Sequence, residues 1–284
     1  MTHNKTIVEV IHTRKTLEGA GVRLHRGFAN AEVPKFDPFL LFDDFSGEDP
    51  DDYIKGFPWH PHRGIETITY MLHGEVRHHD SAGHSGEIRG GDVQWMTAGS
   101  GIMHEEMPQG IHGIQGFQLW LNLPQKSKMT DPKYRDVLKK DIPSTAVGKS
   151  ATVKVIAGEL GNIIGPVKDV KAEPIYLDVQ IKPHGEFKFE IPFDYNTFCF
   201  VISGAIGTSD DEKVSYGKDN IVLFSRTGSQ LSLKSGVNGA HILLMSGRPL
   251  NEPISWYGPI VMNSRAEIET AYNELQTGEF IKKN

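Results

Sequence analysis

The stretch ETITYMLHGEV, residues 66–76, decides how this chain is expected to fold. Its apolar and polar side chains alternate with a period of two, which is typical of a β-strand that buries one face. A similar stretch, NTFCFVISGAI, occupies residues 196–206, with threonine aligned on threonine and glycine on glycine. The segments that follow, GDVQWMTAG (91–99) and KDNIVLFSRTG (218–228), also share one pattern. This internal repeat predicts two β-barrel domains of similar build.

Strand-like runs separated by glycine fill much of the remaining sequence. They include TIVEVIH, IQGFQLWLNL, TVKVIAG, PIYLDVQI and AHILLMSG. Their even spacing, without a βαβ rhythm, favours an all-β sandwich or barrel over a parallel sheet. A chain of 284 residues is long enough for two such domains. We expect them at residues 1–140 and 141–284, with a helix at the end of the second domain.

Helical patterns are few. Residues 263–278, NSRAEIETAYNELQTG, predict a helix that Asn263 or Ser264 caps and that Gly278 ends. A second, short helix is predicted over residues 131–141, DPKYRDVLKKD, where a proline stands in the first turn. The basic stretch that leads into it, beginning QKSKMT, is interpreted as a solvated linker.

The composition narrows the classes of function. A net charge of -6 argues against a direct nucleic-acid partner. The single cysteine, Cys199, cannot form an internal disulfide and is expected to be a buried apolar residue. The beginning, MTHNKTIVEVIH, lacks the apolar run of a signal peptide, and no stretch approaches the ~20 apolar residues of a membrane span. A cytoplasmic protein without membrane contact is therefore expected.

Two pairs of polar residues suggest a metal site. His60 and His62, in FPWHPHRG, lie one residue apart just before the strand at 66–76, so both point to one face of an extended chain. His104 and Glu106, in GIMHEEMP, form a second same-face pair after another strand. Three imidazoles and a carboxylate bind a divalent transition metal and leave coordination positions open. A closed structural zinc site would more often use cysteines.

The repeat is unequal at these histidines. When the two halves are aligned, Glu190 and Pro192 take the positions of His60 and His62, and nothing corresponds to His104. A shared role in folding would predict histidines in both halves. The metal site is therefore expected in the first domain alone.

Other polar residues are weaker candidates. Glu66 has the same parity as the histidines and is an alternative to Glu106 as the fourth ligand, whereas Glu105 has the opposite parity. A further cluster lies in RHHDSAGHSGE, which we interpret as a polar hairpin turn and not as a second metal site. Its histidines are His78, His79 and His84.

At these residues the sequence resembles the pirins, a family of the cupin superfamily. The similar stretches are FDPFLLFDDF (36–45), FPWHPHRGIETITYMLHGEVRHHDSAGHSGEIRGGDVQWMTAGSGIMHEEMP (57–108), QLWLNLP (118–124) and EPISWYGPIVMNS (252–264). The likeness covers most of the first half and part of the second. Its most specific parts are the His-Pro-His-Arg-Gly and Gln-Trp-Met-Thr-Ala-Gly runs.

The resemblance implies an all-β bicupin, in which two jelly-roll-type antiparallel β-barrels lie face to face with few short helices. It implies one metal, in the N-terminal barrel, held by His60, His62, His104 and Glu106. Fe(II) is the expected ion, with Ni, Cu, Co, Mn and Zn as alternatives, because three nitrogens and one oxygen suit several metals. Trp59 stands where some pirins carry a polar residue, which bears on access to the site and not on the ligands.

The resemblance also implies a reaction. Some bacterial pirins resemble quercetin 2,3-dioxygenases, which open a flavonol with O2 and release carbon monoxide. Glu106 would then be both a ligand and the catalytic base, in a monomeric enzyme for a flavonol-like substrate. We expect apolar walls from Ile68, Tyr70, Leu72 and Met103. The alternatives are a metal-binding regulatory protein that acts through a protein partner, as animal pirins do as redox-sensitive co-regulators, and another cupin reaction such as isomerisation or decarboxylation.

Overall fold

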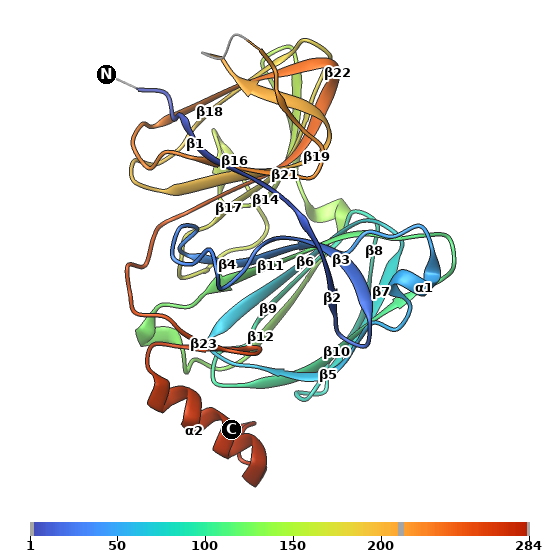
Figure 1. Ribbon diagram of the computed structural model, residues 1–284, viewed down its shortest axis with the longest axis vertical. Helices are drawn as coiled ribbons and strands as arrows, with labels where there is room; N and C mark the ends of the chain where they lie inside the picture. Colours follow the sequence, from blue (N-terminus) through green and yellow to red (C-terminus); the bar gives the residue numbers. More distant parts are fainter. Residues whose placement is uncertain (1–2, 210–212, 283–284) are drawn as a thin grey trace. The chain divides into compact units, whose positions relative to one another are not determined.

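The computed structural model describes residues 3–209 and 213–282, and strands dominate both halves of the chain (Figure 1). The chain folds into two compact units, which we call the N-terminal domain and the C-terminal domain. The N-terminal domain consists of Arg14–Pro34, Phe39–Lys139 and the segment that starts at Leu250. The C-terminal domain consists of the segment that ends at Thr13, Lys35–Pro38 and Lys140–Pro249.

This division differs from the continuous ranges 1–140 and 141–284. The ranges differ because each end of the chain pairs with strands from the opposite half of the sequence. Strand β1 (Ile7–His12) pairs with β21 (Asn220–Phe224) of the C-terminal domain. Near the other end, Ile260 forms a parallel bridge with Arg63 of the N-terminal domain.

Two antiparallel sheets form the N-terminal domain. The larger sheet has the order β12-β9-β6-β11-β4-β3-β2, and the smaller has the order β5-β10-β7-β8. The strands of the larger sheet are β2 (Arg14–Glu18), β3 (Val22–Phe28), β4 (Phe39–Asp44), β6 (Ile65–His73), β9 (Val93–Thr97), β11 (Gln115–Asn122) and β12 (Lys133–Val137). Those of the smaller sheet are β5 (Phe57–His62), β7 (Glu75–Asp80), β8 (Ser85–Arg89) and β10 (Ile102–Gln109).

Short elements complete the N-terminal domain. They are the helix α1 (Pro50–Tyr53), the 3-10 helix η1 (Gln125–Ser127), the hairpin of β23 (Ser255–Tyr257) and β24 (Ile260–Met262), and the helix α2 (Arg265–Thr277). One further 3-10 helix, η2 (Lys139–Asp141), follows β12. Of the described residues, no helix is long and apolar enough to cross a membrane.

The C-terminal domain is built around one large sheet with the main order β1-β21-β19-β22-β17-β14-β13, to which β18 and β20 are attached. Its apolar core contains Cys199, which is buried as expected. The strands not yet given are β13 (Ser144–Val147), β14 (Ala151–Ala157), β17 (Ile175–Ile181), β18 (Glu186–Glu190), β19 (Asn196–Thr208), β20 (Tyr216–Gly217) and β22 (Gln230–Gly247), with a separate hairpin of β15 (Glu159–Leu160) and β16 (Ile163–Ile164).

The internal repeat in the sequence corresponds to a repeat in topology. The two similar stretches form β6 and β19, and the segments that follow them form β9 and β21. The order β9-β6-β11-β4 in one domain matches the order β21-β19-β22-β17 in the other. The expected all-β fold, with two domains of similar build, few helices and a C-terminal helix, is confirmed.

The two predicted helices had different outcomes. Helix α2 is present, with the side chain of Ser264 accepting a hydrogen bond from the amide of Glu267 and with Gly278 in the left-handed conformation, at a φ of 77°. The helix predicted over residues 131–141 is wrong, because β12 forms there and pairs with β9. Pairing with the edge of a sheet satisfies a whole row of backbone groups, which outweighs a weak local helix preference.

Candidate metal centre

The smaller sheet of the N-terminal domain places the four predicted ligands on one face. His104 on β10 lies directly opposite His60 on β5, and Ile102 lies opposite His62. Ligand atoms of His60, His62 and His104 all lie within 4.8 Å of one another. No other group of three His, Cys, Asp or Glu side chains comes this close in residues 3–209 and 213–282. Oε2 of Glu106 lies 4.0 Å from Nε2 of His104, at the edge of the group.

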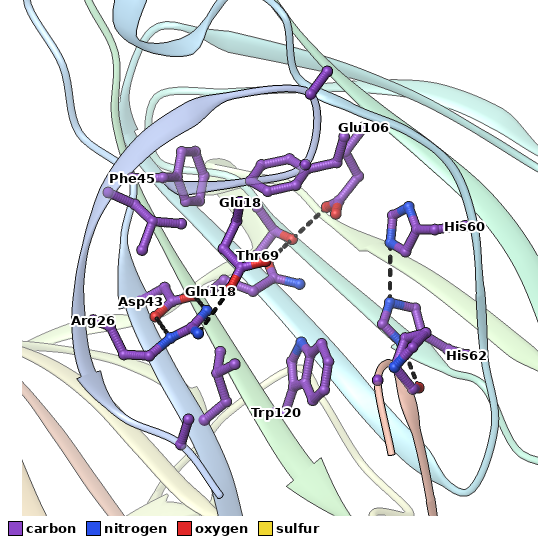
Figure 2. A pocket seen from close by; sticks show the side chains of 18 of the residues that line it. Glu18, Arg26, Asp43, Phe45, His60, His62, Thr69, Glu106, Gln118 and Trp120 are labelled. Atoms are coloured by element: carbon purple, nitrogen blue, oxygen red, sulfur yellow. Dashed lines mark hydrogen bonds and ion pairs between the residues drawn. The ribbon is translucent and has the colours of Figure 1, made fainter. Parts of the chain in front are cut away.

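Backbone carbonyls determine which ring nitrogens of two histidines are free. Nδ1 of His60 lies 2.8 Å from the carbonyl oxygen of Pro58, and Nδ1 of His62 lies 3.1 Å from that of Pro259. A carbonyl oxygen can only accept, so each Nδ1 carries the proton and each Nε2 keeps a lone pair. The two Nε2 atoms nevertheless lie 3.1 Å apart (Figure 2). Two lone pairs at this distance repel each other unless a cation lies between them.

The geometry and charge state of the histidines fit a metal ion. Two nitrogens bound at ~2.1 Å to one ion and at a right angle about it lie ~3.0 Å apart, close to the observed distance. His104 is buried, and neither of its ring nitrogens has a hydrogen-bond partner. Burial lowers the pKa of His60, and burial and neighbouring imidazoles lower the pKa values of His62 and His104 well below the usual range. All three rings are therefore neutral, the state that binds metals.

Glu106 adds one oxygen to this set. Its Oε1 accepts a hydrogen bond from the hydroxyl of Thr69 at 2.8 Å, which leaves Oε2 on the side of His104. Burial raises the pKa of Glu106 to about 7. The Thr69 hydroxyl also lies 2.6 Å from Oε1 of Gln118, a second acceptor. One hydroxyl carries one proton and donates to one acceptor at a time. The Thr69 hydroxyl therefore donates to Glu106 when the side-chain amide of Gln118 presents its N–H, and not its oxygen, to Thr69. Three nitrogens and one oxygen without a thiolate suit a divalent transition metal.

The metal centre opens into a cavity of about 610 Å³ between the two sheets. Figure 2 shows His60 and His62 at one side of it, Arg26 and Asp43 at the opposite side, and Glu18, Gln118 and Trp120 between them. The apolar part of the wall is aromatic and aliphatic, and its large side chains are Leu24, Leu41, Phe45, Phe57, Val76, Trp120 and Trp256.

The expected wall of Ile68, Tyr70, Leu72 and Met103 is wrong, since none of these residues lines the cavity. On β6 the lining residue is Thr69, so the opposite face of the strand turns inward. The reason is Gly64, which has a φ of +78° and separates β5 from β6. It interrupts the alternation, and residues of the same parity on either side of it no longer share a face.

The side of the cavity opposite the histidines carries a set of charges. Arg26 donates from Nε and Nη2 to both carboxylate oxygens of Asp43, at 2.9 and 2.7 Å, and from Nη1 to Glu18 at 2.8 Å. Asp43 is buried, and burial raises its pKa to about 6 although Arg26 opposes this change. One cation and two anions give this set a net negative charge. It presents hydrogen-bond acceptors to anything that occupies the cavity.

The alternative candidates lie elsewhere. Glu66 accepts a hydrogen bond from Thr97 at 2.5 Å, and it points to the face of β6 opposite that of Thr69. Burial raises the pKa of Glu66. Glu105 is paired with His79 at 3.2 Å. Neither Glu66 nor Glu105 lines the cavity.

Two histidines of the expected hairpin turn, His78 and His84, lie against the same ring, that of Tyr134. The segment is a hairpin of β7 and β8, in which His84 lies 2.8 Å from a carboxylate oxygen of Asp80. His78 is buried and stacks on Tyr134, with ring centroids 4.8 Å apart. Trp59 is 49% exposed and also lies outside the cavity lining.

Some residues of the site were missed by the sequence reasoning. Gln118 and Trp120 alternate in QLWLNLP, a polar and an aromatic residue on one face of a strand, which was a usable signal. Arg26 and Asp43 lie directly opposite each other on β3 and β4, but only the pairing of these strands shows it. Pro259 contributes a backbone atom, for which a side-chain pattern contains no signal.

Comparison with known proteins supports one family. Residues 21–121 match the family model named Pirin, and residues 176–281 match the model for the pirin C-terminal cupin domain. A Pseudomonas aeruginosa protein named "Putative quercetin 2,3-dioxygenase" is 41% identical, over 98% of this chain and 99% of that protein.

Solved structures give the same picture. The crystal structure of quercetin 2,3-dioxygenase from Acinetobacter baumannii matches with a TM-score of 0.89 and 33% identity, over 98% of this chain and 99% of that one. The bacterial pirin YhhW from Escherichia coli, solved in complex with nickel(II), matches with a TM-score of 0.65 over 85% of this chain and 98% of that one. At 19% identity, the likeness to YhhW concerns the fold alone.

Proposed function

The chain belongs to the pirin family, and on this premise we propose that it is a metal-dependent dioxygenase that cleaves flavonols such as quercetin with O2 and releases carbon monoxide. The observation that carries the proposal is the set of neutral histidines with Glu106 at the end of a cavity with aromatic walls. The similarity to proteins named quercetin 2,3-dioxygenase supports the same reaction.

His60, His62, His104 and Glu106 would hold the metal, with Fe(II) as the first candidate and other divalent transition metals as alternatives. When bound, the ion supplies Lewis acidity toward a substrate hydroxyl and a redox-active centre for O2. The protein keeps three of the four donors in place before binding, since carbonyls fix the rings of His60 and His62 and Thr69 fixes the carboxylate.

Glu106 is proposed to accept the proton of the substrate hydroxyl. Thr69 donates to its Oε1 and its Oε2 faces the histidines, so the carboxylate would bind the metal through Oε2 and take the proton on the remaining lone pair of Oε1. Burial raises the pKa of this carboxylate in the metal-free protein, so it is a stronger base than an exposed glutamate. The deprotonated substrate is the electron-rich species that reacts with O2.

The cavity fits a flat aromatic molecule with hydroxyl groups. Trp120 lies edge-on to His62, with ring centroids 5.0 Å apart, and offers an apolar face beside the histidines. At the opposite side, Asp43 and Glu18 can accept hydrogen bonds from phenolic hydroxyls. His62, His104 and Glu106 are buried, which reduces the access of water to these donors.

The test starts from the metal-free protein, reloaded separately with Fe(II), Ni(II), Co(II), Cu(II) or Mn(II) and checked by elemental analysis. Quercetin absorbance and released carbon monoxide are then followed under air. We expect turnover with at least one metal, and loss of more than ~100-fold in His60→Ala and Glu106→Gln. Glu105→Gln is the matched control, because this neighbour lies outside the cavity lining.

The outcome separates the proposed reaction from the regulatory alternative. Full metal occupancy without consumption of quercetin would refute the flavonol reaction and favour a metal-binding protein that acts through contacts. Turnover that survives Glu106→Gln unchanged would refute the role of Glu106. Metal content that survives Glu106→Gln but is lost in Glu66→Gln would move the fourth ligand to Glu66.

A further inference from the structure

The C-terminal segment of the chain reaches the metal centre through the turn between β23 and β24. The carbonyl oxygen of Pro259 in this turn accepts the Nδ1 proton of His62, a residue 197 positions earlier. His60 differs, because its partner is the carbonyl of Pro58, two residues away. The orientation of His60 is therefore set locally, whereas that of His62 depends on where the C-terminal segment docks.

The segment docks on the two residues that follow His62. The amide of Val261 donates to the carbonyl of Arg63 at 3.1 Å. The ammonium of Lys128, expected in a solvated linker, is instead buried and donates to the carbonyls of Gly64 and Val261 at 2.9 Å each. A Cβ atom on Gly64 would lie 2.0 Å from the Val261 carbonyl oxygen, so this close approach requires glycine.

Helix α2 secures the same point through the side chain of Arg63. Nη2 of this buried guanidinium donates to Glu274 at 2.6 Å and to the carbonyl of Phe280 at 3.0 Å. The guanidinium also lies over the ring of Phe280, 4.3 Å from its centroid. A buried charge that loses its partner is strongly unfavourable, so Arg63 and α2 hold each other in one arrangement. Helix α2 thereby fixes the peptide next to His62.

The same segment supplies part of the cavity wall. Trp256 lines the cavity and packs against Trp120, with ring centroids 5.7 Å apart, and Trp120 in turn contacts His62 edge-on. The indole N–H of Trp256 donates to the carbonyl of Gly258 at 2.7 Å, which ties this wall to the turn that carries Pro259. The same segment thus contacts one proposed metal ligand, His62, and lines the cavity beside the ligands.

We propose that the C-terminal segment 255–280 is a positioning element of the metal centre. Its Pro259 carbonyl keeps the proton of His62 on Nδ1 and so directs Nε2 toward the metal, while Trp256 holds Trp120 against the same ring. The inference rests on the metal site proposed above. The hydrogen-bond partners of histidine ligands typically change metal affinity ~10- to 100-fold. Loosening the segment therefore weakens metal binding without a change in any ligand.

Full-length point variants test this arrangement. Glu274→Ala removes the carboxylate partner of Arg63, and Trp256→Ala removes the wall residue. Glu269→Ala is the matched control, because Glu269 lies on the same helix, is exposed and pairs with Arg265. Dissociation constants for Co2+ are measured by competition with a chelator, and circular dichroism checks that each variant is folded. We expect increases of ~10-fold or more for Glu274→Ala and Trp256→Ala, and less than twofold for the control.

Proton NMR of the Co2+-loaded protein provides a readout that general destabilisation would not reproduce. The Nδ1 protons of His60 and His62 are expected to give separate, strongly shifted signals. In Glu274→Ala we expect faster exchange with solvent for the His62 proton and no change for the His60 proton. Unchanged Co2+ affinity together with unchanged His62 exchange would overturn the inference. A wild-type protein that binds no Co2+ would overturn the metal site itself, and the proposed function with it.

Discussion

Removal of the Glu106 carboxylate is expected to stabilise the metal-free protein at neutral and alkaline pH. The side chain is buried, and burial raises its pKa from 4.5 to about 7, against the hydrogen bond from Thr69. Each pKa unit corresponds to ~1.4 kcal/mol between the protonated and the charged form. The charged form therefore costs the folded protein ~3 kcal/mol.

The sign of the pH dependence follows from the direction of this shift. Because the folded pKa lies above the unfolded pKa, the stability that comes from protonated Glu106 is complete below pH ~4.5 and is lost as the pH rises to ~7. The glutamine in Glu106→Gln is neutral throughout. The unfolding free energy of the variant, minus that of the wild type, is expected to be near zero at pH 4.5 and ~3 kcal/mol at pH 8.

Urea unfolding of EDTA-treated protein measures this difference. All four tryptophans, which are Trp59, Trp95, Trp120 and Trp256, belong to the N-terminal domain, so their fluorescence reports the domain that contains Glu106. Excess Co2+ is expected to reverse the order of stability, because a ligand that binds only the folded state stabilises the wild type and not the variant.

Two results would refute the reasoning. The first is a free-energy difference that is the same at pH 4.5 and pH 8. The second is a metal-free variant that is less stable than the wild type at pH 8. Burial lowers the pKa values of His60, His62 and His104, which adds an opposite trend below pH ~6.5. Both proteins contain these histidines, so that trend cancels in the difference.

Other changes test the rest of the site. Thr69→Val removes a hydrogen bond to a charged group worth ~1.5–3 kcal/mol, so Ni2+ binding at pH 7 should weaken ~10-fold or more in chelator competition, and an unchanged affinity would contradict the role of this hydroxyl. Asp43→Asn leaves Arg26 without its buried partner and should lower the urea-derived unfolding free energy by ~3–5 kcal/mol, whereas Glu18→Gln, at a half-exposed pair, should cost less than ~1 kcal/mol. Equal losses would argue against the buried pair as the main contact. Removal of the metal by a chelator should lower the midpoint of the tryptophan-monitored thermal transition, and an unshifted midpoint would exclude tight binding in the N-terminal domain.

Local sequence patterns were sufficient to predict most of the strands and part of the candidate metal site. Side chains alternate along any strand, so His104 and Glu106 share a face wherever that strand lies in the fold. Sequence similarity between the two halves predicted two domains of one topology because similar strands make similar pairings. Helix α2 was also predictable, since Ser264 and Gly278 cap it through contacts within a few residues.

The same reasoning failed where one residue or one distant strand changed the outcome. Gly64, with its positive φ, interrupts the alternation between β5 and β6, so Thr69 and not Ile68 faces the cavity. The segment at residues 131–141 has a weak helical pattern, yet it completes the edge of a sheet beside β9. The period of hydrophobic residues along the chain reveals neither the interruption at Gly64 nor the pairing of β12 with β9.

By itself, the sequence determined which residue types line up on each strand, and with them the four candidate ligands. Only the tertiary structure decided what surrounds those ligands. The Arg26–Asp43 pair depends on the register of β3 and β4, and the partner of His62 is a backbone oxygen 197 residues away. Such contacts have no local signature, because they arise from packing between segments that the chain brings together only when it folds.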